Sequence, residues 1–231
     1  MREIAINRTI HQGADTMARL DEYPQPSVAV DTAVLTLEPN GGDLLVLQVP
    51  RPNERGWALP GTFMHVDELL EQAVHRSLRD KAGVTGLRPR QLHVFDAIDR
   101  DDRGRVLSVA HMAVVPLAAL DERFADRTRL MPVSRPGRMW RDHEAIIDAA
   151  VARLRAKYAE YPDPDRLAGE TFTLSDLRRV HEAVAGEPIP RDAFARRLTR
   201  RGLIEPTGET TEGSRGRPAE VYRRQGSPMR R

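Results

Sequence analysis

The sequence predicts a two-domain protein, in which an α/β layered sandwich is followed by a smaller, mainly α-helical domain. Strand-like runs with one amphipathic helix fill the first part, helical periodicity dominates beyond Met139, and a break with two prolines, YPDPDRLAGE, follows that helical pattern. We therefore expect an N-terminal extension over 1–24, a first domain over 25–160 that ends in a linker helix, and a second domain over 161–231.

The composition favours a folded protein without cysteine chemistry. The 231 residues are 40% hydrophobic, which is enough to fill real cores. Cysteine is absent from the sequence, which excludes disulfides and thiolate catalysis. The first residues lack the apolar stretch of a signal peptide, and no run approaches the length of a membrane span. We therefore expect a cytoplasmic protein without a membrane partner.

Each element of the first domain has a local signal. The β-rich run 27–36 and the apolar run LLVLQV are separated by Asn-Gly-Gly-Asp, which predicts a hairpin. The stretch 67–82 predicts a helix that ends at Gly83. Two more strands, LHVFDAI and VLSVAHMAVVPL, are joined by a turn at 101–104. The expected apolar side of the helix consists of Leu69, Leu70, Ala73, Val74 and Leu78.

The last part of the chain has helical signals. The stretch RDHEAIIDAAVARLRAKYAEY carries one apolar stripe. FTLSDLRRVHEAVAG begins with a Thr/Ser cap and ends at a glycine, and a short turn leads to IPRDAFARRLTRRGLIEP. Two short helices, a tight turn and a basic second helix resemble a helix-turn-helix, and GETTEGSRGRPAEVYRR resembles the wing of a winged helix. The stripe consists of Ile146, Ile147, Ala150, Val151 and Leu154.

Charge is distributed unevenly along the chain. The net charge is +2, but 172–231 holds 13 arginines and 8 carboxylates, so this part carries +5 and the rest carries −3. Such asymmetry is typical of a chain in which one part binds a polyanion, although a solvated basic domain has the same composition.

Arginines near the expected second helix and the wing are the candidate contacts to double-stranded DNA. We expect Arg191 and Arg196 to reach base edges, and Arg200 to contact phosphate. One winged helix offers few base contacts, so we expect a homodimer on a palindromic operator. The candidate DNA-binding residues are Arg191, Arg196, Arg197, Arg200, Arg215 and Arg217.

The stretch GTFMHVDELLEQAVHRSLRDKAGV, 61–84, resembles the box of Nudix pyrophosphohydrolases. Leu-Pro-Gly, Glu68, Arg76 and Gly83 stand at the family spacing. In that family, carboxylates on one helical face hold magnesium, which bridges the substrate pyrophosphate. Here those positions are Ser77, Asp80 and Lys81. We therefore expect no catalytic residue, no metal ligand and no cofactor. The simpler interpretation is a core helix in which Arg76 and Glu68 form a surface ion pair.

A closer resemblance is to the bacterial Nudix-related transcriptional regulators of NAD metabolism. Their pattern has a box that ends in Lys-any-Gly, an Asp142-His143 pair before Ile146, Phe-Thr-Leu opening a helix, and Gly-Arg-Pro-Ala before Tyr222. The resemblance implies a Nudix-like α/β/α sandwich that senses ADP-ribose and a dimer of winged helices that represses genes of NAD biosynthesis or salvage. Thr62, usually glycine, and SRPGRMWRDH, usually more apolar, depart from the family pattern.

The loop before the box and the box itself supply the candidate ligand contacts. Guanidinium groups of Arg51 and Arg55 suit pyrophosphate oxygens. Trp57 either stacks on a base or anchors a strand. His111 and His143 are interpreted as structural, because no metal-like spacing accompanies them. The candidate ligand-binding residues are Arg51, Arg55, Trp57, Phe63, Glu68 and Lys81.

Two other functions fit the same residues. One is an active ADP-ribose pyrophosphatase whose second domain is accessory. The other is a regulator of the same architecture that responds to a sugar or another nucleotide and controls sugar metabolism.

Overall fold

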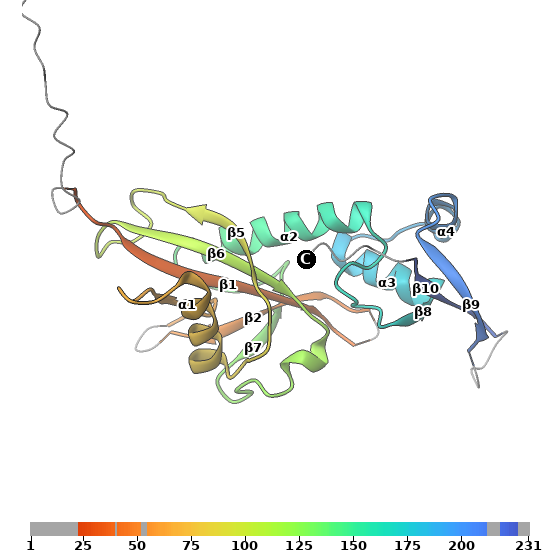
Figure 1. Ribbon diagram of the computed structural model, residues 1–231, viewed down its shortest axis with the longest axis horizontal. Helices are drawn as coiled ribbons and strands as arrows, with labels where there is room; N and C mark the ends of the chain where they lie inside the picture. The colour runs from red at the N-terminus through yellow and green to blue at the C-terminus, as the bar shows by residue number, and fades with distance from the viewer. Residues whose placement is uncertain (1–22, 40, 52–54, 212–217, 226–231) are drawn as a thin grey trace, which may run out of the picture.

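The structure is a computed structural model that describes residues 23–39, 41–51, 55–211 and 218–225. The molecule is elongated, with a large sheet toward one end and a small helical domain at the other (Figure 1). Among the described residues, no helix has the length and apolar character needed to span a membrane.

Strand β1 (Ser27–Leu37) is the centre of the large sheet. It pairs antiparallel with β2 (Leu44–Pro50), with Leu35 opposite Val46, and parallel with β6 (Val106–Val114). The predicted hairpin is therefore confirmed. Strand β5 (Arg90–Phe95) lies beyond β6 at the edge of the sheet.

Three short strands complete this sheet. They are β3 (Trp57–Ala58) and β7 (Arg129–Pro132), which pair with β2, and β4 (Gly61–Phe63), which pairs with β1. The sequence did not predict β7, because four residues bounded by turns give no readable alternation. The short 3₁₀ helix η3 (Leu117–Leu120) was also not predicted.

One helix covers each face of the sheet (Figure 1). On one face, α1 (Leu70–Ser77) continues as a π-helix, η2 (Leu78–Ala82), and packs on a cluster that includes Val30 and Val34. On the other face, α2 (His143–Glu160) packs on a cluster that includes Ala33 and Leu35. The first domain is therefore an α/β/α sandwich, as the sequence predicts.

The helix expected over 67–82 is shorter and less regular than expected. The helix begins at Leu70, where the Gln72 side chain accepts a hydrogen bond from the Leu69 N–H at 2.8 Å. Leu69, expected on the buried side, is 70% exposed. The predicted end is confirmed, because Gly83 adopts φ 68°. The segment 67–69 is held by contacts to Arg76 described below, which a helical periodicity does not reveal.

Helix α2 buries the stripe that its sequence predicts. The five apolar residues of the stripe are all buried in the core between α2 and the sheet. The same side of the helix carries His143 at its first turn and Tyr158 near its last turn.

The second domain is a winged helix. It contains β8 (Thr171–Thr173), α3 (Leu174–Ala185), α4 (Arg191–Arg200), β9 (Ile204–Thr210) and β10 (Glu220–Arg224), and its sheet has the order β8-β10-β9. The Asp176 N–H donates to Thr173 Oγ1 at 3.1 Å, and the Thr173 N–H donates back to the Asp176 carboxylate. The predicted Thr cap and the end at Gly186 are both confirmed.

The two expected domains share a hydrophobic core. Val180 and Val184 of α3 lie in the same cluster as Leu154 of α2 and Leu37 of β1. The turn between β1 and β2 also approaches α3 closely, since a Cβ on Gly41 would lie 2.5 Å from Arg179 Cβ. The division at 160–161 stays a prediction, but the segments on either side of it are firmly packed together.

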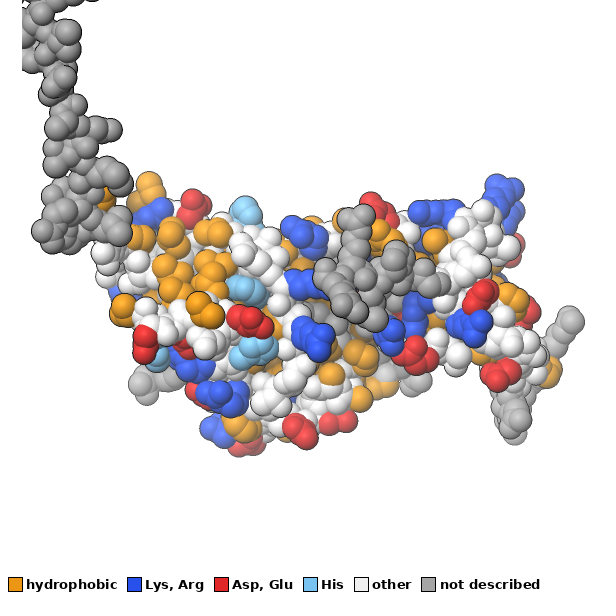
Figure 2. Space-filling view, viewed as in Figure 1, with side chains coloured by type: hydrophobic (Ala, Val, Ile, Leu, Met, Phe, Trp, Pro, Cys, Tyr) orange, Lys and Arg blue, Asp and Glu red, His pale blue; other side chains and the backbone are white. Residues whose placement is uncertain are grey.

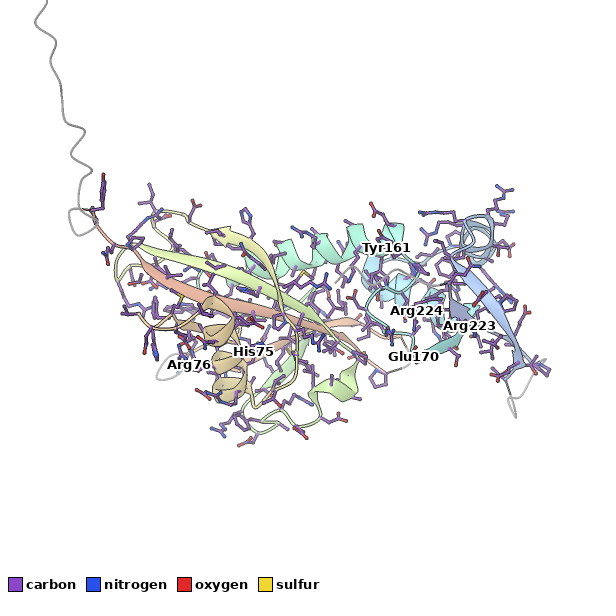
Figure 3. The ribbon with its side chains drawn as sticks, in the orientation of Figure 1. His75, Arg76, Tyr161, Glu170, Arg223 and Arg224 are labelled. Atoms are coloured by element: carbon purple, nitrogen blue, oxygen red, sulfur yellow. The ribbon has the colours of Figure 1, made fainter. Side chains whose placement is uncertain are left out.

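A buried carboxylate fastens the segment between α2 and β8. Asp163 accepts hydrogen bonds from the Tyr158 hydroxyl at 2.8 Å and from the Leu167 and Ala168 N–H groups. Arg224 of β10 donates to the same carboxylate at 2.9 Å and to the Gly169 carbonyl. Figure 3 shows Arg224 at this junction, beside Glu170. The Asp163 carboxylate therefore connects the end of α2, the segment that follows α2, and strand β10.

His181 occupies a buried position between three helices. Its ring makes edge contacts with Tyr158 of α2 and Phe194 of α4, at centroid distances of 5.2 and 4.9 Å. Its Nε2 donates to the Pro162 carbonyl. Burial is the main cause that lowers the pKa of His181 to about 4, so the ring is neutral at pH 7.

The free energy of unfolding should therefore decrease as the pH falls from about 6.5 toward 4. The unfolded chain takes up a proton at His181 near pH 6.5 and the folded protein only near pH 4, so this stability is present above the unfolded pKa and is lost below it. Urea denaturation at several pH values should show a weaker acid dependence in His181→Phe. Equal pH dependence in both proteins would contradict this assignment.

Candidate functional site

A cavity of about 470 Å³ opens beside the central strand, between the Nudix-like box and the N-terminal end of α2. Its walls come from β1, β2, β3, β4, η2, the segment 100–103 and the segment 140–143. The volume lies in the usual range for small-molecule sites. Residues far apart in sequence therefore form one concave surface.

The lining of this cavity is predominantly basic. Six arginine or lysine side chains face three carboxylates, and the aromatic side chains Phe63 and Trp140 stand among them. Guanidinium groups hold phosphate in a bidentate manner, and an aromatic face accepts a base by stacking. The cavity is therefore suited to an anionic ligand with a flat ring. The basic residues are Arg51, Lys81, Arg100, Arg103, Arg127 and Arg141.

A buried ion network fixes the inner wall. Both ends of the Arg100 guanidinium bind Asp142, at 2.9 and 2.8 Å, and Nη2 lies 3.7 Å from Asp31. Ser108 donates to Asp31 at 2.6 Å. Asp31 lies in β1, Arg100 in a turn, Ser108 in β6 and Asp142 directly before α2, so the network joins four separate parts of the chain.

His143 completes this wall in its neutral form. Its Nδ1 accepts a hydrogen bond from the Leu59 N–H at 2.9 Å, so the proton of the neutral ring lies on Nε2, 3.5 Å from Asp31 Oδ1. Burial is the largest cause that lowers the pKa of His143. Nδ1 of His111 lies 2.9 Å from the Val109 carbonyl, whereas His143 lines the cavity.

Arg76 holds the loop that precedes α1. Its Nε and Nη2 each donate to Glu68 at 2.7 Å, Nη1 donates to Thr62 Oγ1 and Nη2 also donates to the Phe63 carbonyl. These hydrogen bonds lower the pKa of Glu68 to about 2. Glu68 is not among the residues that line the cavity, and its contact with a ligand stays a prediction. The Thr62 hydroxyl oxygen accepts one of the hydrogen bonds from Arg76.

The three positions that hold magnesium in Nudix hydrolases do not fit that ion here. The buried Ser77 hydroxyl donates to the Val74 carbonyl of its own helix at 3.0 Å. The Lys81 ammonium donates to the Gly61 carbonyl, and Arg79 binds the Asp80 carboxylate at 2.7 Å. Among the described residues, no group of three histidine, cysteine or acidic side chains is placed to bind a metal ion.

The π-helical turn directs these side chains. In a regular helix, residues 77 and 81 would stack on one face, but the wider turn of η2 separates them. Ser77 faces the core, whereas Asp80 and Lys81 line the cavity. Burial is the largest cause that lowers the pKa of Lys81.

A second cavity of about 280 Å³ adjoins the first one. The two cavities share Arg51, Trp140 and Arg141. The guanidinium carbons of Arg51 and Arg141 lie 3.0 and 4.4 Å from the centre of the Trp140 ring. Trp140 with these two arginines is called the shared wall below. The other residues that line the second cavity are Arg55, Gly56, Trp57, Asp102, Arg138 and Met139.

The structure brings most of the predicted ligand-binding residues to these cavities. Phe63 and Lys81 line the first, Arg55 and Trp57 line the second, and Arg51 lines both. Trp57 has a guanidinium over its ring, since Arg129 lies 4.1 Å from its centre. Sequence reasoning did not select Asp31, Arg100, Trp140 or Arg141. The polar residue Asp31 inside an apolar strand was a signal that points to such a site.

The exposed side of α4 forms the second candidate site. Arg191, Arg196 and Arg200 are exposed, and none of them forms an ion pair with a described residue. Other arginines of this domain do, including Arg178 with Glu182 and Arg223 with Glu205. Figure 2 shows basic side chains gathered at this end of the molecule. The surface therefore presents positive charge that its own domain does not neutralise.

Arg197 does not line the outside of α4 as expected. It is half-buried, and its guanidinium lies 5.4 Å from the centre of the Phe194 ring and near His181. The helical period turns position 197 toward α3, whereas positions 196 and 200 share the outer face. Arg215 and Arg217 lie outside the described residues.

Fold and site define a class of protein, a Nudix domain with a basic cavity joined to a winged helix. The sequence model of the NUDIX domain matches residues 28–153, and that of the NrtR DNA-binding winged helix domain matches residues 166–224. A crystal structure of Shewanella oneidensis NrtR complexed with a 27mer DNA is 33% identical, with a TM-score of 0.68 over 86% of this chain and 93% of that chain. The chain belongs to the NrtR family.

Other comparisons extend this similarity. The chain is 27% identical over 229 residues to an ADPR responsive transcriptional repressor of Acinetobacter baylyi, covering 95% of this chain and 90% of the relative. The NUDIX domain of Shewanella oneidensis NrtR, complexed with ADP ribose, is 28% identical with a TM-score of 0.51, over 60% of this chain and 94% of that chain. An ADP-ribose pyrophosphatase of Methanocaldococcus jannaschii is 31% identical over 54% of this chain and 73% of the relative.

Proposed function

We propose that the protein is a DNA-binding transcriptional repressor of NAD biosynthesis or salvage genes, and that its Nudix domain binds ADP-ribose or a related nucleotide. The observation that carries the proposal is the presence of a basic cavity and an unneutralised basic helix on one packed chain. Relatives that match nearly the whole chain are a repressor responsive to ADPR and a protein crystallised with DNA. A cytoplasmic location is part of the proposal.

The proposed regulator is a homodimer. One α4 reaches only a short stretch of DNA, so useful specificity requires two recognition helices on a two-fold operator, about 34–36 Å or a multiple apart. Selection of bound sequences from random duplexes by the full chain should return a palindrome, and ADP-ribose should change the affinity for it. If the selection returned no palindromic site, the proposed function as a transcriptional regulator would be contradicted.

Arginines that read bases and arginines that contact phosphates should behave differently. Replacement of Arg196 by alanine should cost about 1–3 kcal/mol on the operator and relax the preference at one position. Replacement of Arg200 should weaken binding to all duplexes alike and reduce the salt dependence. Fluorescence anisotropy at several salt concentrations measures both effects. A uniform loss in both variants would contradict base reading by Arg196.

We further propose that the Nudix domain does not hydrolyse ADP-ribose. Ser77 and Lys81 occupy positions where magnesium requires oxygen ligands, and the ammonium of Lys81 repels the ion. Chromatography should show no AMP above background after incubation with magnesium. The similarity to an archaeal ADP-ribose pyrophosphatase makes a hydrolase the second candidate. Magnesium-dependent AMP release that Asp80→Ala abolishes would establish that alternative.

Genes of nicotinate or nicotinamide metabolism beside this gene would support NAD control. Sugar-utilisation genes there would instead favour the regulator of sugar metabolism.

A further inference from the structure

The described lining of the second cavity holds more arginines than carboxylates. Its lining holds four arginines, Arg51, Arg55, Arg138 and Arg141, and one carboxylate, Asp102. Asp102 already accepts a hydrogen bond from Arg141. Arg55 and Arg138 are exposed and form no ion pair with a described carboxylate. The cavity therefore concentrates positive charge on a concave surface, which raises the local concentration of anions.

The shared wall is held in a strained conformation. Arg141 has φ 46°, a left-handed backbone that is unfavourable for a residue with a side chain. Its side chain is fixed by donation to the Arg100 carbonyl at 3.2 Å and by its contacts with Asp101 and Asp102. Strain of this kind persists where surrounding structure over-determines the backbone, and it concentrates at ligand sites.

The wall of the second cavity that carries Arg138 is also held in place. The Trp57 N–H donates to the Arg138 carbonyl at 3.2 Å, and the Trp140 N–H donates to the Trp57 carbonyl at 2.8 Å. The backbone of 138–140 is therefore fastened to β3, and Arg138 extends from a fixed point. About 280 Å³ holds roughly nine water molecules at about 30 Å³ each, which is enough for a hydrated phosphate.

We propose that the second cavity is an anion subsite that takes a phosphomonoester group beside the nucleotide held in the first cavity. Ligands that carry a phosphate beyond the diphosphate are then the preferred class. Arg55 and Arg138 pair with the added phosphate, while the shared wall contacts both parts of the ligand. This inference rests on the proposed binding of a diphosphate nucleotide in the first cavity.

Calorimetry on the full chain tests the subsite with ADP-ribose, ADP-ribose 2′-phosphate and inorganic phosphate. We expect the phosphorylated ligand to bind about tenfold more tightly than ADP-ribose, at low ionic strength. Arg138→Gln should abolish this difference and leave binding of ADP-ribose nearly unchanged. Arg135→Gln, an exposed arginine of the same segment that lines neither cavity, should preserve it.

The titration with inorganic phosphate distinguishes a free phosphate ion from a phosphate group on the nucleotide. If free phosphate tightens ADP-ribose binding and Arg138→Gln removes the effect, the subsite takes a free ion. Equal affinity for both nucleotides, with no effect of phosphate, would overturn the subsite and leave the proposed function intact. If neither nucleotide binds the wild type, the proposed function fails with it. An unchanged melting temperature of Arg138→Gln without ligand shows that the fold is preserved.

Discussion

Replacement of Asp163 by alanine should destabilise the protein by about 3–5 kcal/mol. The side chain is fully buried, and its loss leaves the Arg224 guanidinium without its buried counterion. Two backbone N–H groups and the Tyr158 hydroxyl lose their acceptor as well. An unsatisfied buried donor costs about 1–3 kcal/mol, so the individual losses are not small. Urea denaturation of the full chain measures the change.

Glu170 provides a matched control for this measurement. It also binds Arg224, at 3.5 Å, but its side chain is 73% exposed. Glu170→Ala should therefore change the free energy of unfolding by no more than about 1 kcal/mol. If Asp163→Ala were no more costly than Glu170→Ala, Asp163 would not be the group that fastens the junction.

Replacement of Arg100 by methionine should cost about 3 kcal/mol of stability. Its side chain is 5% exposed and binds Asp142 with two hydrogen bonds, while Asp31 stands 3.7 Å away. Removing the guanidinium leaves one buried and one partly buried carboxylate beside a neutral histidine. The same variant should also weaken nucleotide binding, because the inner wall of the first cavity loses its support.

Arg79→Met is the comparison for Arg100→Met. Arg79 also binds a carboxylate at 2.7 Å, but both side chains of that pair are more than half exposed. Thermal denaturation should show a change of at most about 1 kcal/mol for Arg79→Met. Similar losses in both variants would show that burial of the Arg100 network contributes little.

The sequence predicts elements whose signal is local and misses contacts that depend on the fold. The buried stripe of α2, the two ends of α3 and the hairpin all follow from periodicity, capping residues and turn residues. The predicted start of α1 is wrong, because Arg76 holds the segment before Leu69 as a loop and the helix is capped only at Leu69.

The candidate site was only partly predictable for the same reason. Loop arginines and the box residues stand near a recognisable motif, so Arg51 and Lys81 could be selected as candidates, and both line the first cavity. Asp31, Arg100 and His143 are brought together across more than 100 residues of sequence, and of the three only Asp31, a polar residue inside an apolar strand, has a local signal of such a site. Trp140 and Arg141 belong to the segment that departs from the family pattern, and they line both cavities.

Helix α2 has its two ends in different functional regions. His143, in its first turn, lines the first cavity, and Tyr158, in its last, is bound to Asp163 at the junction. Its 18 residues span about 27 Å. If α2 turned as a rigid rod by about 5° at the cavity, its far end would move by about 2 Å, the size of interface helix shifts in allosteric transitions. In a dimer, opposite displacements would add and alter the distance between the two recognition helices.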